Sequence, residues 1–274
     1  YIKSNDEFIQ PVSRRNEVLG FLDNPLGDLC ISRPKERLPW GIPLPFDEDY
    51  VTYVWFDALI NYISAHGSLD EVKKSGFWPA SHHLLGKDIL TTHAVYWSTI
   101  LKAIGLDPAH NLFAHGWWTN EGEKISKSLG NVIDPYHLVD KYGLDQVRYF
   151  LLREVPFGND GDFSPPAMVN RLNGELANDF GNLAQRVLSM IAKNCGGAVP
   201  PPGTLAGDDE TLLAEVHGLL EKTRKNMDVQ AFHEVLATIW AVIRACNVYI
   251  DRQAPWKLKT EDPERMATVL YVLA

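Results

Sequence analysis

The sequence predicts an α/β half built on a parallel sheet, followed by an all-α helical bundle. The first observation is a strand–helix–strand succession in the middle of the chain. Two apolar segments, 82–86 (HHLLG) and 111–119 (NLFAHGWWT), have the length and composition of buried strands. Between them, residues 90–105 repeat apolar side chains at helical spacing and end on glycine, which is typical of a helix. This order is that of a βαβ unit, whose strands are parallel.

The second observation is that the periodicity turns helical from Asp134 onward. Apolar side chains there recur every three or four residues, as on the buried face of an amphipathic helix. Helices packed along such faces form a bundle. Helices are expected at 134–155, 167–194, 212–220 and 232–250, separated in part by loops at 156–166 and 195–210.

The N-terminal third is rich in loops. Residues 26–33 (LGDLCISR) and 50–59 (YVTYVWFDAL) are predicted as short strands because they concentrate β-branched and aromatic side chains. Prolines at 34, 39, 43 and 45 interrupt any regular element between these two segments.

Composition excludes several classes of protein. The 274 residues carry a net charge of −9, whereas a protein that coats nucleic acid non-specifically is basic. No apolar run approaches the roughly 20 residues of a membrane span, so no membrane partner is expected. Three widely separated cysteines fit a reducing compartment, so a cytoplasmic location is expected, with an organellar matrix as the alternative. No metal-ligand spacing is evident, and no metal site is predicted.

The segment 122–131, GEKISKSLGN, is the strongest candidate for a ligand-binding loop. Lys124 and Lys127 would place positive charge on a triphosphate. Ser126 and Ser128 would add hydroxyl donors, and the flanking glycines let the backbone bend sharply. The loop follows the second predicted strand, and open α/β sheets bind ligands at the carboxyl ends of their strands. On composition alone, a solvated surface loop is the alternative.

Three stretches of the chain resemble a known family. KISKS, residues 124–128, resembles the KMSKS loop of class I aminoacyl-tRNA synthetases, with Ile125 in place of methionine. Residues 53–62 (YVWFDALINY) and 86–97 (GKDILTTHAVYW) resemble the amino-acid pocket of methionyl-tRNA synthetases. The resemblance continues through AHGWWTNEGEKISKSLGNVIDP and covers essentially the whole chain. It implies a Rossmann-type catalytic half, an anticodon-binding bundle, and a ligase that joins methionine to tRNA.

The resemblance also implies a domain organisation. Class I synthetases carry a HIGH-type motif near their first Rossmann strand, and no such tetrapeptide occurs here. The chain is therefore expected to be the C-terminal portion of an enzyme that is complete only with its N-terminal half. The expected segments are the end of an inserted connective domain at 1–25, the second Rossmann half at 26–133, a connecting helical segment at 134–166 and a truncated anticodon-binding domain at 167–274.

The resemblance implies a methionine pocket, and the residue types suit a thioether. Sulfur is polarizable and favours aromatic edges, so tryptophan and tyrosine fit methionine. Leu59 and Asn61 differ from the proline and glycine of some family members. Ordinary core positions are the alternative for the aromatic and histidine side chains, and a favourable helix start is the alternative for Asp88. The pocket residues by this resemblance are Trp55, Ala58, Leu59, Tyr62, Asp88, Ile89, His93 and Trp97.

An ATP site is implied in the same way. Lys124 and Lys127 are the expected catalytic residues, because phosphoryl chemistry depends on positioning and on stabilising negative charge. Magnesium is expected to accompany ATP. The ATP-binding residues by this resemblance are Lys124, Ser126, Lys127, Ser128, Lys87, His115 and Gly116.

The helical half carries a candidate RNA-binding group. Asn182 and Arg186 are four residues apart and share one helix face, and Trp256 follows a proline at the end of a predicted helix. Amide and guanidinium groups for base edges and an aromatic ring for stacking are what single-stranded RNA recognition uses. The resemblance implies that Asn182, Arg186 and Trp256 read the CAU anticodon of tRNA(Met). An ordinary helix surface followed by a turn is the alternative.

Two rival functions stay open from the sequence. A leucyl, valyl, isoleucyl or cysteinyl synthetase would share the class I features, although Trp55 and Tyr62 favour methionine. A non-catalytic tRNA-binding module would fit the absent HIGH motif, although the lysine loop argues against it. The sequence does not fix the oligomeric state.

Overall fold

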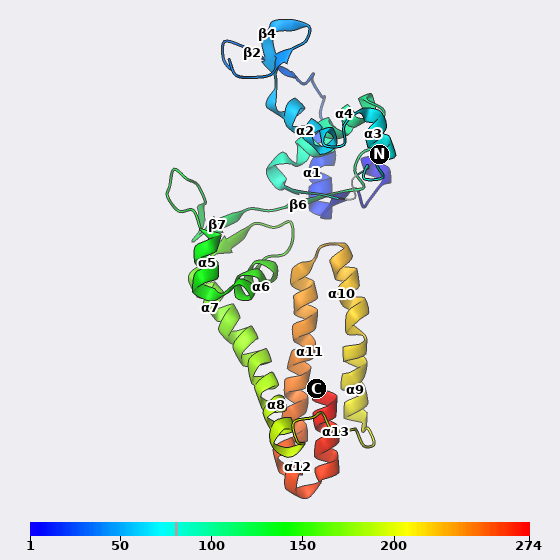
Figure 1. Cartoon of the computed structure of the whole chain (residues 1–274), viewed down its shortest axis with the longest axis vertical. Coiled ribbons are helices and arrows are strands. Elements are labelled where there is room, and N and C mark those ends of the chain that lie inside the picture. Colours follow the sequence, from blue (N-terminus) through cyan, green and yellow to red (C-terminus); the bar gives the residue numbers. More distant parts are fainter. Residues whose placement is uncertain (80–81) are drawn as a thin grey trace. The chain divides into compact units, whose positions relative to one another are not determined.

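The computed structural model describes residues 1–79 and 82–274, which form two compact units (Figure 1). Contacts divide the chain between Trp117 and Trp118. The elements of the first unit are η1 Ile2–Ser4, β1 Ile9–Gln10, α1 Val12–Leu22, β2 Ser32–Pro34, β3 Pro43–Leu44, β4 Asp47–Thr52, α2 Val54–Ser64, α3 Leu69–Lys74, β5 His82–Gly86, η2 Lys87–Ile89, η3 Thr92–Trp97, α4 Ser98–Ala103 and β6 Asn111–His115.

A parallel sheet with strand order β1-β6-β5 organises the first unit. β5 and β6 pair from His82 opposite Asn111 to Gly86 opposite His115. The helical segments η2, η3 and α4 connect these two strands, so the predicted βαβ unit is confirmed. Gly105 follows α4 with a φ of 75°, a conformation that glycine adopts without strain.

Two apolar clusters hold the first unit together. The segment η3 belongs to both, because Ala94 packs with the sheet and Trp97 packs with α2. Full burial of a large apolar side chain stabilises a fold by roughly 1.5–3 kcal/mol. The cluster on the sheet contains Phe8, Ile9, Val18, Leu85, Leu90, Ala94, Ala109, Leu112 and Ala114, and the second contains Leu59, Ile63, Val72, Trp78, Trp97, Leu101 and Leu106.

Residues 50–59 do not form a single strand. β4 ends at Thr52 and α2 begins at Val54, so the predicted strand is wrong in its second half. Trp55, Leu59 and Ile63 recur four residues apart and pack on one helical face into the second cluster. This burial outweighs the strand propensity of the aromatic and β-branched side chains.

The segment 26–33 also forms less strand than predicted. Only Ser32–Pro34 is strand β2, which pairs with β4 in an antiparallel sheet of order β2-β4-β3. Residues 26–31 are exposed, so the apolar side chains that suggested a strand bury little surface there.

The N-terminal segment contributes to the parallel sheet. β1 pairs with β6 at Ile9 opposite Leu112, and Val18 of α1 packs into the same cluster. The limits 1–25, 26–133, 134–166 and 167–274 stay predictions, but the segment assigned to an inserted domain supplies a strand of the sheet.

The strand predicted at 111–119 divides in two. β6 ends at His115, and β7 belongs to a different sheet of order β8-β7-β9. β9 lies inside the loop predicted at 156–166 and pairs in parallel with β7. The lysine loop therefore follows the β7–β8 hairpin, and the prediction that it leaves the parallel sheet of the first unit is wrong. Residues 116–117 separate the two strands and allow the chain to change sheets.

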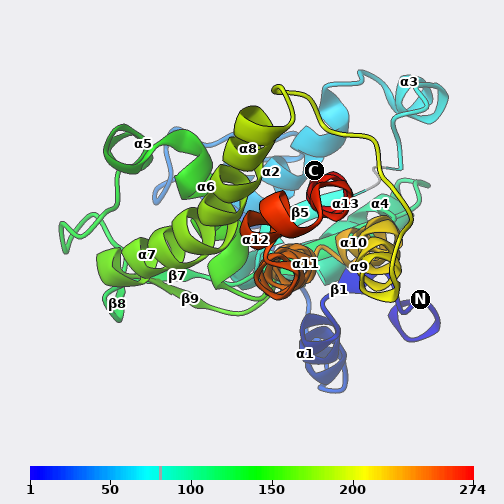
Figure 2. The ribbon, with the colours of Figure 1, turned by 90° about the horizontal axis from the view of Figure 1, so that it is seen from below.

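The second unit continues as helices, as predicted from Asp134. α7, η4 and α8 run without interruption from Pro165 to Asn194, which confirms the long helix. α9 and α10 follow one another along the long helix α11 (Figure 1), and Figure 2 shows the three nearly end-on. The elements are β7 Trp118–Asn120, β8 Glu123–Lys124, α5 Pro135–Tyr142, α6 Leu144–Glu154, β9 Gly161–Phe163, α7 Pro165–Arg171, η4 Leu172–Gly181, α8 Asn182–Asn194, α9 Gly207–His217, α10 Leu219–Asp228, α11 Phe232–Gln253, α12 Pro255–Glu261 and α13 Pro263–Leu273.

A buried ionic group ties three helices of the bundle together. Asp209 of α9 is fully buried and accepts hydrogen bonds from the Tyr249 hydroxyl at 2.6 Å and from Arg265 Nη2 at 2.7 Å. Its neighbours are on α11 and α13, so one carboxylate links helices that are distant in sequence. These donors hold the pKa of Asp209 at about 2 despite its burial, which by itself would raise it.

Within the described ranges, none of the helices combines the length and apolar character needed to cross a membrane.

Candidate functional site

The predicted methionine-pocket residues gather on α2 and on the connection between β5 and β6. The Tyr62 hydroxyl lies 3.0 Å from Nε2 of His93, and Nδ1 of His93 lies 2.9 Å from the Ile89 carbonyl oxygen. A carbonyl can only accept, so Nδ1 carries the proton and donates it. Nε2 is then the acceptor, and the Tyr62 hydroxyl donates to it. The proton of the Tyr62 hydroxyl therefore lies in the hydrogen bond to His93.

A second histidine, His83, completes this aromatic group, and sequence reasoning missed it. Its ring centroid lies 4.3 Å from that of Tyr62, and its Nε2 accepts from Trp97 Nε1 at 3.3 Å. The alternation of β5 was the available signal, because it places His83 and Leu85 on the buried face.

Both buried histidines are neutral. Burial lowers the pKa of His83 to about 4, and the charge that His93 would carry lowers it further. Burial also lowers the pKa of His93, although the hydrogen bond to Ile89 opposes the change. The part of the pocket wall formed by Tyr62, His83, His93 and Trp97 therefore presents aromatic rings, which suit an uncharged thioether side chain.

The other predicted pocket residues lie at different depths. Trp55 is half-buried and meets His93 edge-on, with ring centroids 6.3 Å apart. Leu59 is only 1% exposed and packs in the cluster that contains Trp97. Ala58 faces solvent. Trp97 is buried, and its ring centroid lies 5.9 Å from that of Tyr62.

The carboxyl ends of β5 and β6 bring a second set of predicted residues together. Trp117 Nε1 donates to Asp88 Oδ1 at 3.4 Å, and Lys87 Nζ lies 4.5 Å from the centre of the Trp117 ring. His115 is exposed and its Nδ1 donates to the Gly116 carbonyl at 2.8 Å. Lys87, Asp88, His115 and Gly116 thus lie at the edge of the sheet where α/β proteins bind ligands.

Gly86 ends β5 directly beside the Asp88 carboxylate. A Cβ atom on Gly86 would stand 2.6 Å from Asp88 Oδ1 and 3.8 Å from the His115 ring. A side chain at this position would therefore shift the Asp88 carboxylate from its place near Trp117.

The lysine loop of the second unit has an ordered internal structure. Lys124 ends β8, and Lys127 lies in the turn that follows and is exposed. Ser126 Oγ accepts from the Leu129 amide at 3.2 Å and lies 3.0 Å from Ser128 Oγ. Both serine hydroxyls therefore bond within the loop, and their predicted role as phosphate donors stays a prediction.

The entrance of the loop is fixed by Asp162 on β9. Its Oδ1 accepts from the Gly122 amide at 2.7 Å and from the Thr119 hydroxyl at 2.5 Å. These donors lower the pKa of Asp162. Gly122 has a φ of 82°, which favours glycine at this sharp turn. The two lysines are thus presented from a hairpin anchored to a neighbouring strand.

The predicted anticodon residues form a group within the bundle. Arg186 lies over the exposed Trp256 ring, with its guanidinium carbon 5.3 Å from the ring centre. Arg186 Nη2 also donates to Asp251 at 2.5 Å, which orients the guanidinium. Asn182 is exposed one turn away on α8. An aromatic ring and a guanidinium group are therefore adjacent at this surface, and the predicted anticodon role of the three residues stays a prediction.

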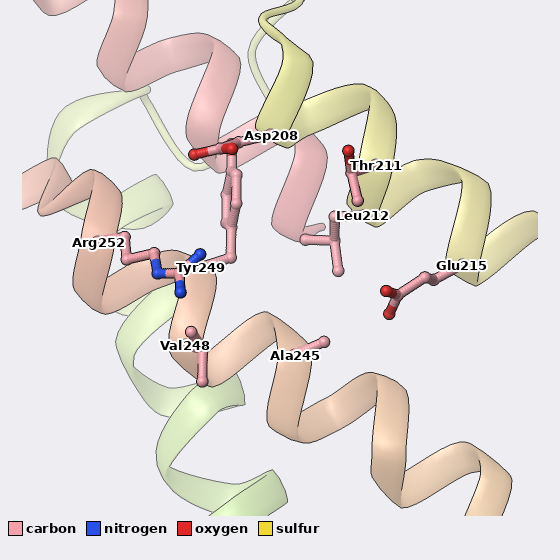
Figure 3. Close-up of a pocket in the computed structure, with 8 residues that line it drawn as sticks. All are labelled: Asp208, Thr211, Leu212, Glu215, Ala245, Val248, Tyr249 and Arg252. Carbon is pink, nitrogen blue, oxygen red and sulfur yellow. The ribbon is translucent and has the colours of Figure 1, made fainter.

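A pocket of about 230 Å³ opens between α9 and α11 (Figure 3). None of its lining residues is a predicted site residue. Figure 3 shows apolar side chains between the two helices, with Arg252 and the acidic Asp208 and Glu215 around them. Its lining residues are Asp208, Thr211, Leu212, Glu215, Ala245, Val248, Tyr249 and Arg252.

In the part of the chain that the structure describes, no group of three His, Cys, Asp or Glu side chains could hold a metal ion. The cysteines Cys30, Cys195 and Cys246 are not disulfide-bonded.

Comparison with known proteins shows the family to which the chain belongs. Residues 1–188 match the family described as tRNA synthetases class I (M), and residues 199–273 match the anticodon binding domain of methionyl tRNA ligase. The chain belongs to the methionyl-tRNA synthetase family. The predicted family and the predicted fold, a parallel-sheet catalytic half followed by a helical anticodon-binding domain, are thereby confirmed.

Relatives align over almost all of the chain. The methionine–tRNA ligase of Brucella suis biovar 1 is 54% identical over 99% of the chain, and that of Mycobacterium tuberculosis is 48% identical over 98%. A structure of the M. tuberculosis methionyl-tRNA synthetase with methionyl-adenylate has a TM-score of 0.90 and covers 99% of the chain. The chain spans about half the length of these relatives, 53% and 54% respectively for the B. suis protein and the M. tuberculosis structure.

Proposed function

We propose that this chain is part of a methionine–tRNA ligase, which activates methionine with ATP and transfers it to tRNA(Met). The observation that carries the proposal is the neutral group formed by Tyr62, His93 and Trp97 in a member of this family. A side chain with a thioether has little to hydrogen-bond, so its recognition depends on shape and on contact with aromatic rings.

In the first step, a methionine carboxylate oxygen attacks the α-phosphorus of ATP, and the bond to pyrophosphate breaks. Negative charge gathers on the phosphates as this happens. Lys124 and Lys127 stabilise that charge, and Lys127 is the main contact with ATP. Magnesium on the triphosphate would assist in the same way. Lys87, His115, Gly116, Ser126 and Ser128 are assigned supporting roles in ATP binding.

In the second step, a hydroxyl of the terminal tRNA ribose attacks the activated carbonyl, and AMP leaves. Asn182, Arg186 and Trp256 bind the CAU anticodon in this proposal. The exposure of Asn182 and Trp256 and the contact of Arg186 with the Trp256 ring support it, because splayed bases need a stacking surface and polar side chains beside it.

The experiment measures methionine-dependent ATP–pyrophosphate exchange. It uses a full-length protein that contains this chain and matches its relatives in length. Exchange with methionine, and much less exchange with leucine, isoleucine, valine or cysteine at equal concentration, is the expected result. Equal exchange with leucine or cysteine would contradict the assigned substrate. A protein that binds tRNA(Met) without any exchange would instead be a non-catalytic tRNA-binding module.

A further inference from the structure

The loop that carries Lys124 and Lys127 is held by a side chain to which the proposed reaction assigns no role. Asn131 lies four residues beyond Lys127, and its amide reaches back across the loop. Asn131 Oδ1 accepts from the Ser126 amide at 2.9 Å, and Asn131 Nδ2 donates to the Lys124 carbonyl at 3.0 Å. One side-chain amide thus pairs with the backbone on both sides of Ile125, as a neighbouring strand would.

Asn131 is itself fixed to the folded unit. Its backbone carbonyl accepts from Asn120 Nδ2 at 3.1 Å. Asn120 ends β7, which pairs with β8 on one side and with β9 on the other. The amide therefore connects the exposed loop to a sheet.

The two backbone groups that Asn131 binds are next to the lysines. One is the carbonyl of Lys124, and the other is the amide of Ser126, the residue before Lys127. Other bonds of the loop are the Gly122 amide to Asp162 Oδ1 at 2.7 Å and the Gly130 amide to the Lys127 carbonyl at 3.3 Å. Loss of the Asn131 side chain would remove both hydrogen bonds that flank Ile125 between the two lysines.

We propose that Asn131 is a positioning residue for ATP activation, and that its side-chain amide sets the separation and direction of Lys124 and Lys127. The inference rests on the proposed role of these lysines. Catalysis by charge stabilisation depends on groups held in place before the reaction, and a displacement of about 1 Å can lower a rate roughly 100-fold. An amide that only stabilised the fold would have no such effect on kinetics.

The test is Asn131→Ala in a protein of the relatives' full length, measured by ATP–pyrophosphate exchange. We expect kcat/KM for ATP to fall by about 10- to 100-fold, with the KM for methionine changed by less than about twofold. Asn194→Ala is the matched control, because Asn194 Nδ2 also donates to a backbone carbonyl, that of Met190, at 2.9 Å. The control should leave both kinetic constants within about twofold.

The decisive arm combines Asn131→Ala with Lys124→Ala and Lys127→Ala together. If Asn131 acts by positioning the two lysines, its removal should lower the rate of the protein that lacks both of them by no more than about twofold. A further loss as large as that of Asn131→Ala alone would overturn the proposal. So would an Asn131→Ala protein with a lower melting temperature and unchanged kinetics.

Two further results keep the inference distinct from the proposed function. Near-normal exchange by Lys127→Ala alone would refute the role of the lysine, whatever Asn131 does. Should Asn131→Ala fail to fold, Asn120→Ala removes only the anchor of the Asn131 backbone and keeps the amide contacts. That variant is expected to raise the KM for ATP by a smaller factor of about three, and an unchanged KM there would overturn the inference.

Discussion

The Tyr62 hydroxyl donates its proton to Nε2 of His93, whose opposite nitrogen donates to the Ile89 carbonyl. This chain of two hydrogen bonds fixes the direction of the phenol and the tautomer of the imidazole together. It leaves the lone pairs of the Tyr62 oxygen, and no proton, to face a ligand.

Tyr62→Phe tests this arrangement. The variant leaves a buried acceptor on His93 without its donor and lets the ring turn, which costs about 1–3 kcal/mol in such sites. We expect the KM for methionine to rise about 10-fold, with the KM for ATP nearly unchanged, in pyrophosphate exchange. Tyr271→Phe is the control, because Tyr271 is 41% exposed and Tyr62 is 40% exposed. An equal KM for methionine in both variants would contradict the assignment of Tyr62 to the methionine pocket.

The neutral His83 predicts how stability depends on pH. The unfolded chain binds a proton at His83 below about pH 6.5, whereas the folded protein, with a pKa of about 4, does not. The free energy of unfolding should therefore fall as the pH drops from about 6.5 to about 4, by about 2–3 kcal/mol from this residue. Above pH 6.5 this contribution is constant. The lowered pKa of His93 acts in the same direction.

Denaturant titrations between pH 7.5 and 5 would measure this effect. His83→Gln removes the titrating group and keeps an acceptor for Trp97 Nε1, so its stability should depend less on pH than that of the unaltered chain. His82→Gln, at the exposed neighbouring position, should keep the original pH dependence. Identical slopes for both variants would show that His83 titrates normally.

The fully buried Asp209 predicts a stability change in the bundle. Asp209→Ala would leave Arg265 and the Tyr249 hydroxyl without their partner, and breaking a buried ion pair costs about 3–5 kcal/mol. The exposed Asp208→Ala should lower the free energy of unfolding by less than about 1 kcal/mol. Urea denaturation followed by circular dichroism distinguishes the two. Similar losses would mean that the buried carboxylate has no special role.

Arg186→Ala tests the anticodon surface. The variant removes the cation over Trp256 and a donor for base edges, and each such contact contributes about 1–3 kcal/mol. We expect the KM for tRNA(Met) in aminoacylation to rise about 10- to 100-fold, with adenylate formation unchanged. Arg224→Ala on the exposed face of α10 should leave both reactions unchanged. A normal KM for tRNA in Arg186→Ala would remove α8 from the binding surface.

The sequence predicted correctly those helices and strands whose apolar periodicity matches the face that is buried in the structure. The strand 82–86, the helix that follows it and the long helix through Asn182 have strong periodicity, and the structure confirms them. Residues 54–59 contain strand-forming types on a helix, because the packing of Leu59 and Ile63 on distant residues decides their structure. Local pattern does not report such contacts.

The same reasoning explains what was missed in the candidate site. His83 shares a face with Leu85, but its contacts with Tyr62 and Trp97 join segments about 14 to 21 positions apart. Asn131 was part of the quoted loop, yet its two hydrogen bonds depend on how the loop folds back on itself. The sequence shows that His83 and Asn131 are present, but only the folded structure shows which groups they bond.

We propose that the loop around Lys127 binds the triphosphate of ATP during methionine activation. The most direct measurement is ATP–pyrophosphate exchange by Lys127→Ala in a protein of the relatives' full length, beside Lys222→Ala on α10 as the control. We expect a loss of about 100-fold or more for Lys127→Ala. We also expect nearly unchanged affinity for free methionine and a normal rate for Lys222→Ala. A near-normal exchange rate in Lys127→Ala would contradict the proposal.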